Sequence, residues 1–220
     1  MELTYLGHSA FEIKINDKKI LIDPFLPLSP NYDSEGVIDI FVTHGHADHL
    51  GSAIDISKET GAEITAIFEL ANYCVSKGAS VNGISLGSWI EYEWGKVIAV
   101  PAFHSSSTPE GVYAGCPCGY IFNINDKIIY HAGDTCLNSE MKIIGELYEP
   151  DIVMLPVGGH YTMDIEHAVK ASEWLGASAV IPMHYNTFEA INIDILEFER
   201  EVRALGKIPL VLQVGQKVDG

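Results

Sequence analysis

The chain has 220 residues, 47% of them hydrophobic, and a formal net charge of −17 at pH 7. The excess of 30 acidic over 13 basic side chains repels polyanions and excludes nucleic acid as an expected partner. Four cysteines in a chain of this size form no secreted disulfide framework, and no apolar run approaches a membrane span. We therefore expect one cytoplasmic domain over residues 1–220 that binds neither nucleic acid nor a membrane.

The first part of the chain predicts strands that alternate with helices. Short apolar runs separated by turns predict a β-meander that ends at Asp23, with strands at residues 3–6, 10–15 and 19–22. After the meander we expect a strand at 38–42, a helix at 50–60, a strand at 63–68, a helix at 69–77 and a strand at 80–84.

The second part repeats this order. We expect strands at 88–93, 97–100, 118–124, 128–130, 152–155, 179–181 and 209–212, with helices at 138–147, 164–175 and 189–205. Two meanders, each followed by helices, predict two mixed β-sheets packed face to face with helices outside. The expected fold class is therefore α/β, a four-layer αββα sandwich.

Residues 44–49 read His-Gly-His-Ala-Asp-His and follow directly on an apolar strand. Side chains two positions apart on an extended chain point to the same side, so His44 and His46 can hold one cation. A bend at the glycine between them would turn Asp48 and His49 toward a neighbouring cation. A hydrogen-bonded structural cluster is the alternative, but three imidazoles and a carboxylate on one turn favour a site for two metal ions.

Three further candidates for metal ligands lie just after apolar strands. Two metals need about three protein ligands each, so residues 44–49 alone are an incomplete site. The additional candidates are His104, Asp134 and His184. A lone histidine after a strand is more often structural, but loops that follow strands can gather at one edge of a sandwich. The joint position of these residues therefore favours metal binding.

The order of these motifs resembles that of hydrolases of the metallo-β-lactamase superfamily along nearly the whole chain. The Thr-His-x-His-x-Asp-His loop, a later histidine, a Gly-Asp-Thr segment and a final histidine all occur in the superfamily's order. Residues 6–11 and 156–163 further resemble small metal-dependent hydrolases related to the lactonases that act on ascorbate phosphate. The resemblance implies that His44, His46 and His104 hold one metal, that Asp48, His49 and His184 hold the other, and that Asp134 bridges both.

The resemblance also implies roles in catalysis and support. It places His8 and His160 near the substrate, where they could stabilise an oxyanion or a leaving group, and Asp48 could also accept a proton. Asp23 resembles an aspartate that supports a ligand imidazole. The alternatives are core or surface histidines, and a turn-forming aspartate before proline.

These features predict a metal-dependent hydrolase. Two divalent ions, zinc first and manganese or iron as alternatives, would supply hydroxide to attack a small ester, lactone or phosphoester. Members of this fold that carry out redox chemistry usually have a glutamate at the position of His46 and a flavin domain, so hydrolysis is favoured. The alternatives are a phosphodiesterase or RNA-processing nuclease of the same superfamily, which the acidic charge disfavours, and a metal-binding protein without turnover. Symmetric self-association stays open.

Overall fold

The computed structural model describes residues 1–219. The chain forms two compact units, each built on one seven-stranded sheet. Unit 1 comprises Met1–Leu86, Ser105–Cys118 and the described residues from Gln213 onward, and unit 2 comprises Gly87–His104 and Gly119–Leu212. The single domain expected over residues 1–220 stays a prediction.

The sheet of unit 1 is mixed and has the strand order β14-β1-β2-β3-β4-β5-β6. Its strands are β1 (Glu2–Gly7), β2 (Ala10–Ile15), β3 (Lys18–Ile22), β4 (Val37–Phe41), β5 (Glu63–Ile67), β6 (Val81–Ile84) and β14 (Lys217–Asp219). The strands joined by tight turns, β1 to β3, pair antiparallel, whereas β3 to β6 pair in parallel. The predicted meander is confirmed, but β14 was not predicted.

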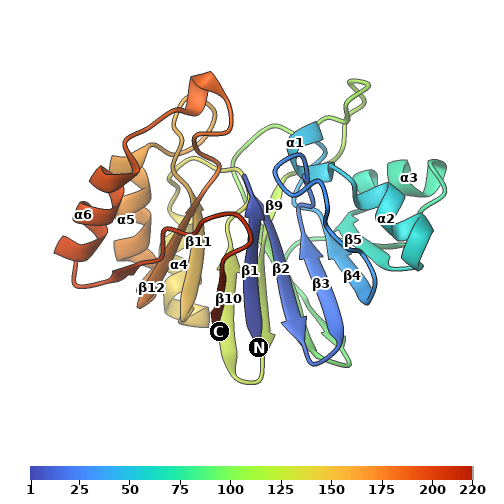
Figure 1. The fold of residues 1–220 in the computed structure, drawn as a ribbon, viewed down its shortest axis with the longest axis horizontal. Helices are drawn as coiled ribbons and strands as arrows, with labels where there is room; N and C mark the ends of the chain where they lie inside the picture. The colour runs from blue at the N-terminus through green and yellow to red at the C-terminus, as the bar shows by residue number, and fades with distance from the viewer. Residues whose placement is uncertain (220) are drawn as a thin grey trace. The chain divides into compact units, whose positions relative to one another are not determined.

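The helices of unit 1 are α1 (Ala47–Leu50), α2 (Ala53–Thr60) and α3 (Phe68–Ser76), and α2 and α3 lie beside β4 and β5 (Figure 1). The helix predicted at 50–60 ends at Thr60 as expected but begins only at Ala53, and a separate turn, α1, precedes it. Gly51 separates α1 from α2 because its φ is 44°. A Cβ atom at Gly51 would lie 2.3 Å from the carbonyl oxygen of Pro24, so only glycine fits. The break confines α1 to one turn directly after residues 44–46.

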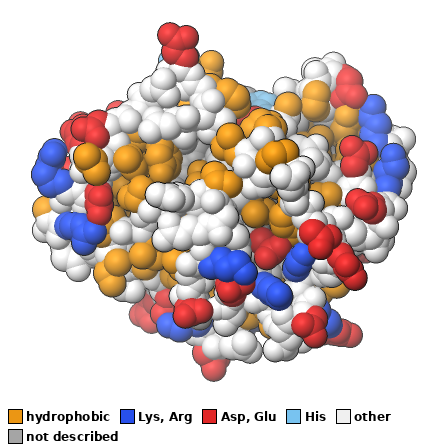
Figure 2. Space-filling model, in the orientation of Figure 1, with side chains coloured by type: hydrophobic (Ala, Val, Ile, Leu, Met, Phe, Trp, Pro, Cys, Tyr) orange, Lys and Arg blue, Asp and Glu red, His pale blue; other side chains and the backbone are white. Residues whose placement is uncertain are grey.

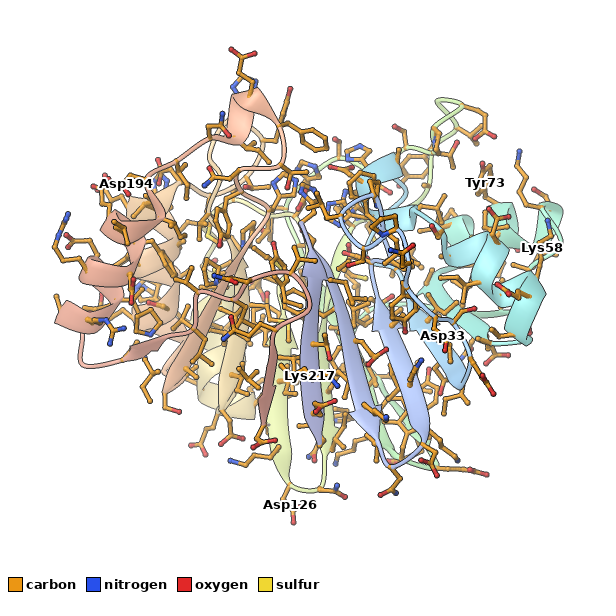
Figure 3. The ribbon with its side chains drawn as sticks, in the orientation of Figure 1. Asp33, Lys58, Tyr73, Asp126, Asp194 and Lys217 are labelled. Carbon is orange, nitrogen blue, oxygen red and sulfur yellow. The ribbon has the colours of Figure 1, made fainter. Side chains whose placement is uncertain are left out.

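The sheet of unit 2 is also mixed, with the strand order β13-β12-β11-β10-β9-β8-β7. Its strands are β7 (Trp89–Tyr92), β8 (Gly95–Pro101), β9 (Cys118–Ile124), β10 (Lys127–His131), β11 (Ile152–Pro156), β12 (Ala179–Met183) and β13 (Ile208–Pro209). Strands β9 and β10 form an antiparallel hairpin with Asp126 at its turn (Figure 3), whereas β10 to β13 are parallel. The last strand is shorter than the predicted 209–212.

The helices of unit 2 are α4 (Glu140–Tyr148), α5 (Ile165–Leu175) and α6 (Ile195–Ala204), with a 3₁₀ turn η1 (Glu189–Ile191) before α6. The helix predicted at 189–205 therefore begins later than expected. Asp194, labelled in Figure 3, accepts a hydrogen bond from the backbone N–H of Leu196 and caps α6. The polar cap fixes the start of the helix.

The surface and the cysteines agree with the composition. None of the four cysteines, all of which lie in the described residues, forms a disulfide bond. Among the described residues, no helix has the length and apolarity that a bilayer crossing requires. On the face that Figure 2 shows, basic side chains are interspersed with acidic ones.

Candidate metal centre

Unit 1 places four of the predicted ligands directly after β4. The chain is still extended at His46, with φ −63° and ψ 150°, and α1 begins at the next residue. Nε2 of His44 lies 3.0 Å from Nδ1 of His46, so the two imidazoles point to the same side, as predicted. Asp48 and His49 follow on α1. The ring centroids of His44 and His49 are 4.2 Å apart.

Gly45 holds this segment against the loop at residues 105–114. Its N–H donates to Oγ of Ser106 at 3.2 Å. A Cβ atom at Gly45 would lie 2.6 Å from Cβ of Ala114, so a larger residue would displace the loop. The chain bends over residues 43–46, as predicted for Gly45, and the lack of a side chain at Gly45 also lets the backbone approach this loop closely.

Asp23 connects the strand β3 to this segment. Its Oδ1 accepts the N–H of Thr43 at 2.8 Å, and its Oδ2 accepts the Thr43 hydroxyl and Nδ1 of His49, both at 2.7 Å. All three side chains are buried. The contact of Asp23 with an imidazole is confirmed, whereas the role of His49 as a metal ligand stays a prediction.

This network sets the tautomers of two imidazoles. Because Asp23 accepts from Nδ1 of His49, the proton is on Nδ1, and Nε2 is the nitrogen that can coordinate a metal. The Thr43 hydroxyl gives its only proton to Asp23, so it accepts from Nδ1 of His44 at 3.0 Å. Nε2 of His44 is therefore also the nitrogen that can coordinate a metal. The role of Thr43 was missed by the sequence analysis, although its place before His44 was a signal.

We expect Asp23→Ala to lower the free energy of unfolding of the metal-free protein by about 3 kcal/mol or more. The change leaves three buried donors, two on Thr43 and one on His49, with no acceptor in place of the carboxylate. Denaturant unfolding in the presence of a chelator measures this loss without a contribution from metal. Asp23→Asn, which keeps one carbonyl oxygen, should lose less; a loss below about 1 kcal/mol for the alanine variant would contradict the assigned network.

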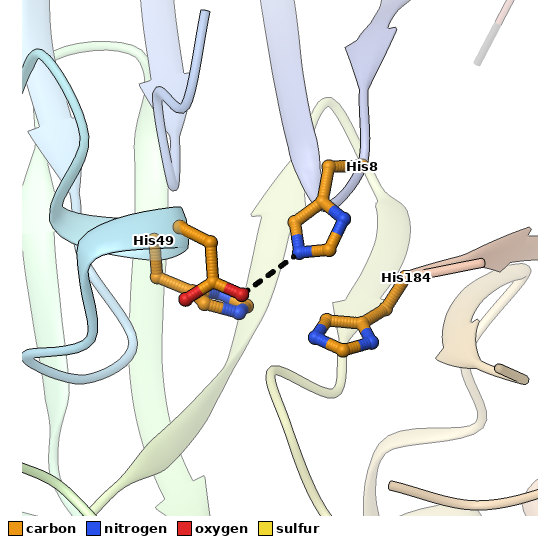
Figure 4. Close-up of side chains that lie close together, drawn as sticks. His8, His49 and His184 are labelled. Carbon is orange, nitrogen blue, oxygen red and sulfur yellow. Dashed lines mark hydrogen bonds and ion pairs between the residues drawn. The ribbon is translucent and has the colours of Figure 1, made fainter. Parts of the chain in front are cut away.

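His8 lies on the turn between β1 and β2 and is buried. The dashed line in Figure 4 marks its hydrogen bond from Nε2 to Oδ2 of Asp48, at 3.1 Å. The same view shows His49 beside this pair. One ligand atom from each of His8, Asp48 and His49 lies within 4.8 Å of the others. The structure therefore brings His8 to the ligand candidates of unit 1.

Unit 2 brings together the three remaining ligand candidates. His104 follows β8, Asp134 follows β10 and His184 follows β12. Oδ2 of Asp134 lies 3.1 Å from Nε2 of His184 and 3.5 Å from Nε2 of His104. Asp134 and His184 are both buried, and β10 and β12 run in the same direction through β11. The carboxyl ends of these strands therefore share one edge, as the sequence predicted.

Thr135 forms hydrogen bonds with the two loops that carry His104 and His160. Its Oγ1 accepts the N–H of Phe103 at 3.0 Å, and its carbonyl oxygen accepts the N–H of Met163 at 3.2 Å. These bonds hold the loops of His104 and His160 against the loop of Asp134. The sequence analysis gave Thr135 no role, although it belongs to the Gly-Asp-Thr motif.

His160 lies on an adjacent loop and is exposed. Its φ is 56°, a left-handed conformation that a histidine adopts at a cost. A Cβ atom at Gly158 would lie 2.2 Å from the carbonyl oxygen of His184, so the loop packs closely on that ligand candidate. The structure thus brings His160 near the cluster of unit 2 with its side chain accessible.

The donor chemistry of both clusters fits a metal. Imidazole nitrogens and carboxylate oxygens are the ligands that zinc, manganese and iron take in proteins. In unit 1 the imidazole tautomers are fixed by Asp23 and Thr43, as in many metal sites where an outer carboxylate orients a ligand histidine. These clusters are able to bind metal.

Comparisons with known proteins point to the same chemistry. The sequence matches a family model described as a β-lactamase superfamily domain over residues 2–184. A UPF0173 metal-dependent hydrolase of Methanopyrus kandleri is 45% identical and covers 94% of this chain and 93% of its own. Another, from Methanosarcina barkeri, is 44% identical and covers 100% and 98%. The solved structure of Igni18, a metallo hydrolase from the hyperthermophilic archaeon Ignicoccus hospitalis, has a TM-score of 0.90 at 38% identity and covers 99% and 97%.

Proposed function

Because this chain belongs to the UPF0173 metal-dependent hydrolases of the β-lactamase superfamily, we propose that it hydrolyses a small ester, lactone or phosphoester with two divalent metal ions. The metallo-β-lactamase fold and the α/β class expected from the sequence are confirmed, as is a metal-dependent hydrolase. The finer resemblance to ascorbate-phosphate lactonases stays a prediction. The metals, their number and the substrate are the proposed part.

The proposed ligands divide into two sets joined by one carboxylate. In this proposal His44, His46 and His104 would hold the first metal, Asp48, His49 and His184 would hold the second, and Asp134 would bind both. The observation that carries this proposal is the position of Asp134, whose Oδ2 lies beside Nε2 of His104 and of His184, one ligand from each set. A carboxylate can span two ions, whereas an imidazole nitrogen binds one.

The metal ions, Asp48 and His160 have different proposed roles in hydrolysis. When bound, two divalent ions make water nucleophilic near neutral pH and polarise the oxygen of the scissile bond; zinc is our first choice. Asp48 orients the attacking water or accepts its proton. His160, exposed on a loop that packs against the backbone of His184, donates a hydrogen bond to the developing oxyanion or to the leaving group.

The substrate is proposed to be a small molecule of the cytoplasm. A net charge of −17 supports this choice because a nucleic-acid site needs cationic side chains that release counterions. Basic side chains interspersed with acidic ones, as on the face in Figure 2, offer no such site there. An RNA-processing activity is therefore disfavoured.

The proposal predicts that metal content and hydrolysis rise together. The purified protein, stripped with a chelator and reloaded with Zn²⁺ or Mn²⁺, should bind close to two equivalents by elemental analysis. The loaded protein should then cleave at least one compound in a screen of lactones, carboxylic esters, thioesters, small phosphodiesters and a short RNA.

Three outcomes would contradict it. Saturation at one equivalent rejects the dinuclear centre. Cleavage of RNA, with tight and strongly salt-dependent binding, favours the nuclease. Full metal loading without hydrolysis of any compound in the screen favours a metal-binding protein that has no enzymatic activity.

A further inference from the structure

His8 occupies a strained position in the turn between β1 and β2. Its φ is 58° and that of Gly7 is 107°, so two successive residues have positive φ. A non-glycine residue held in this region costs free energy, and such residues gather at functional sites. The hydroxyl of Tyr5 donates to the carbonyl oxygen of His8 at 3.2 Å and helps to hold the turn. The strained backbone therefore indicates that the imidazole of His8 has a role beyond forming the turn.

The imidazole of His8 is enclosed by aromatic rings. Its ring centroid lies 5.6 Å from that of Phe25 and 5.7 Å from that of His49, both in edge-on geometry. The side chain has no exposed surface. Packing on two sides fixes the direction of the ring and hence of its nitrogens.

The hydrogen bond of His8 determines which nitrogen carries the proton. Nε2 lies 3.1 Å from Oδ2 of Asp48. A carboxylate oxygen can only accept, so Nε2 is the donor and has no lone pair for a metal. The side chain of Asp48 is 27% exposed and lies on the four-residue helix α1, whereas that of His8 is fully buried.

We infer that His8 is a positioning residue for Asp48. By holding Oδ2, it fixes the carboxylate rotamer and would leave Oδ1 available to the metal that Asp48 and His49 would share. This inference rests on the proposed function, because it takes Asp48 as a ligand. It is an alternative to the substrate contact that the family resemblance implied for His8, which stays a prediction.

The test compares His8→Gln with His8→Leu. Both side chains place a Cβ on the same left-handed backbone and have similar length, but only the amide of glutamine can donate where Nε2 of His8 does. Zn²⁺ affinity of the stripped full-length chain is measured by competition with a chromogenic chelator. We expect His8→Leu to weaken one zinc equivalent by about ten- to a hundredfold, and His8→Gln to restore most of that loss.

Denaturant unfolding of the metal-free variants is the control for structure. A folding defect would lower the zinc affinity and the unfolding midpoint of both variants. If His8→Leu does not fold, His8→Asn replaces it, because asparagine suits the left-handed backbone but its amide falls short of Asp48.

Two outcomes overturn the inference. Wild-type affinity in His8→Leu means that the hydrogen bond does not position Asp48. Equal losses in both variants, with one equivalent missing, mean that His8 is itself a ligand. Saturation of the wild-type chain at one equivalent rejects the dinuclear centre instead, and the ratio between the two variants still reports on His8.

Discussion

Replacing Asp134 by alanine is expected to lower kcat/KM about a hundredfold or more and to weaken zinc binding in the same preparation. Asp134 contacts both His104 and His184, which are assigned to different metals. Without the carboxylate, both ions lose a ligand and their mutual repulsion is less screened. Steady-state kinetics and zinc equivalents, measured on one protein sample, test whether the two losses occur together.

A matched pair of conservative variants separates this effect from a general loss of charge. Asp134→Asn keeps the shape of the side chain but removes its charge, and it should lose much of the activity. Asp126→Asn makes the same change in the same unit at the exposed turn between β9 and β10 (Figure 3), where φ is 64° and asparagine fits well. Asp126→Asn should behave as wild type. Full activity and metal content in both Asp134 variants would mean that the bridge is assigned to the wrong residue.

The elements that the sequence predicted best are those whose signal is local. Apolar alternation in β2 and the apolar runs of β3, β11 and β12 define strands by themselves. The ligand candidates could be found because they directly follow such strands, and because the spacing of His44 and His46 is that of an extended chain. Periodicity and residue type were sufficient for these features.

The features that were missed depend on contacts between distant residues. Gly51 ends α1 because it meets the backbone of Pro24, and β14 forms because its short polar segment pairs with β1 at the sheet edge. The partner of His8 lies 40 positions away in the sequence, and that of His49 lies 26 away. No local pattern identifies such pairs. The contact of Asp23 with an imidazole was therefore predicted only from the family resemblance, and the hydrogen bond between His8 and Asp48 was not predicted.

Replacing His160 by alanine is expected to leave metal content unchanged and to lower kcat by about a hundredfold or more, the scale for losing one acid, base or oxyanion donor. The seven proposed ligands supply both metals without it. Its exposed imidazole is instead presented by a loop that Thr135 and Gly158 fix against the cluster of unit 2.

The control for His160→Ala is His167→Ala. His167 is a second exposed histidine of the same unit, and its Nδ1 pairs with the exposed Asp164. His160→Gly adds a variant that suits a φ of 56° and so removes the imidazole without backbone strain. Loss of kcat in both His160 variants, with zinc equivalents at the wild-type value and His167→Ala unaffected, assigns the imidazole to the reaction. A fall in zinc content would make His160 a ligand, and unchanged kcat would make it a structural residue, because a group that stabilises the transition state cannot be removed without slowing turnover.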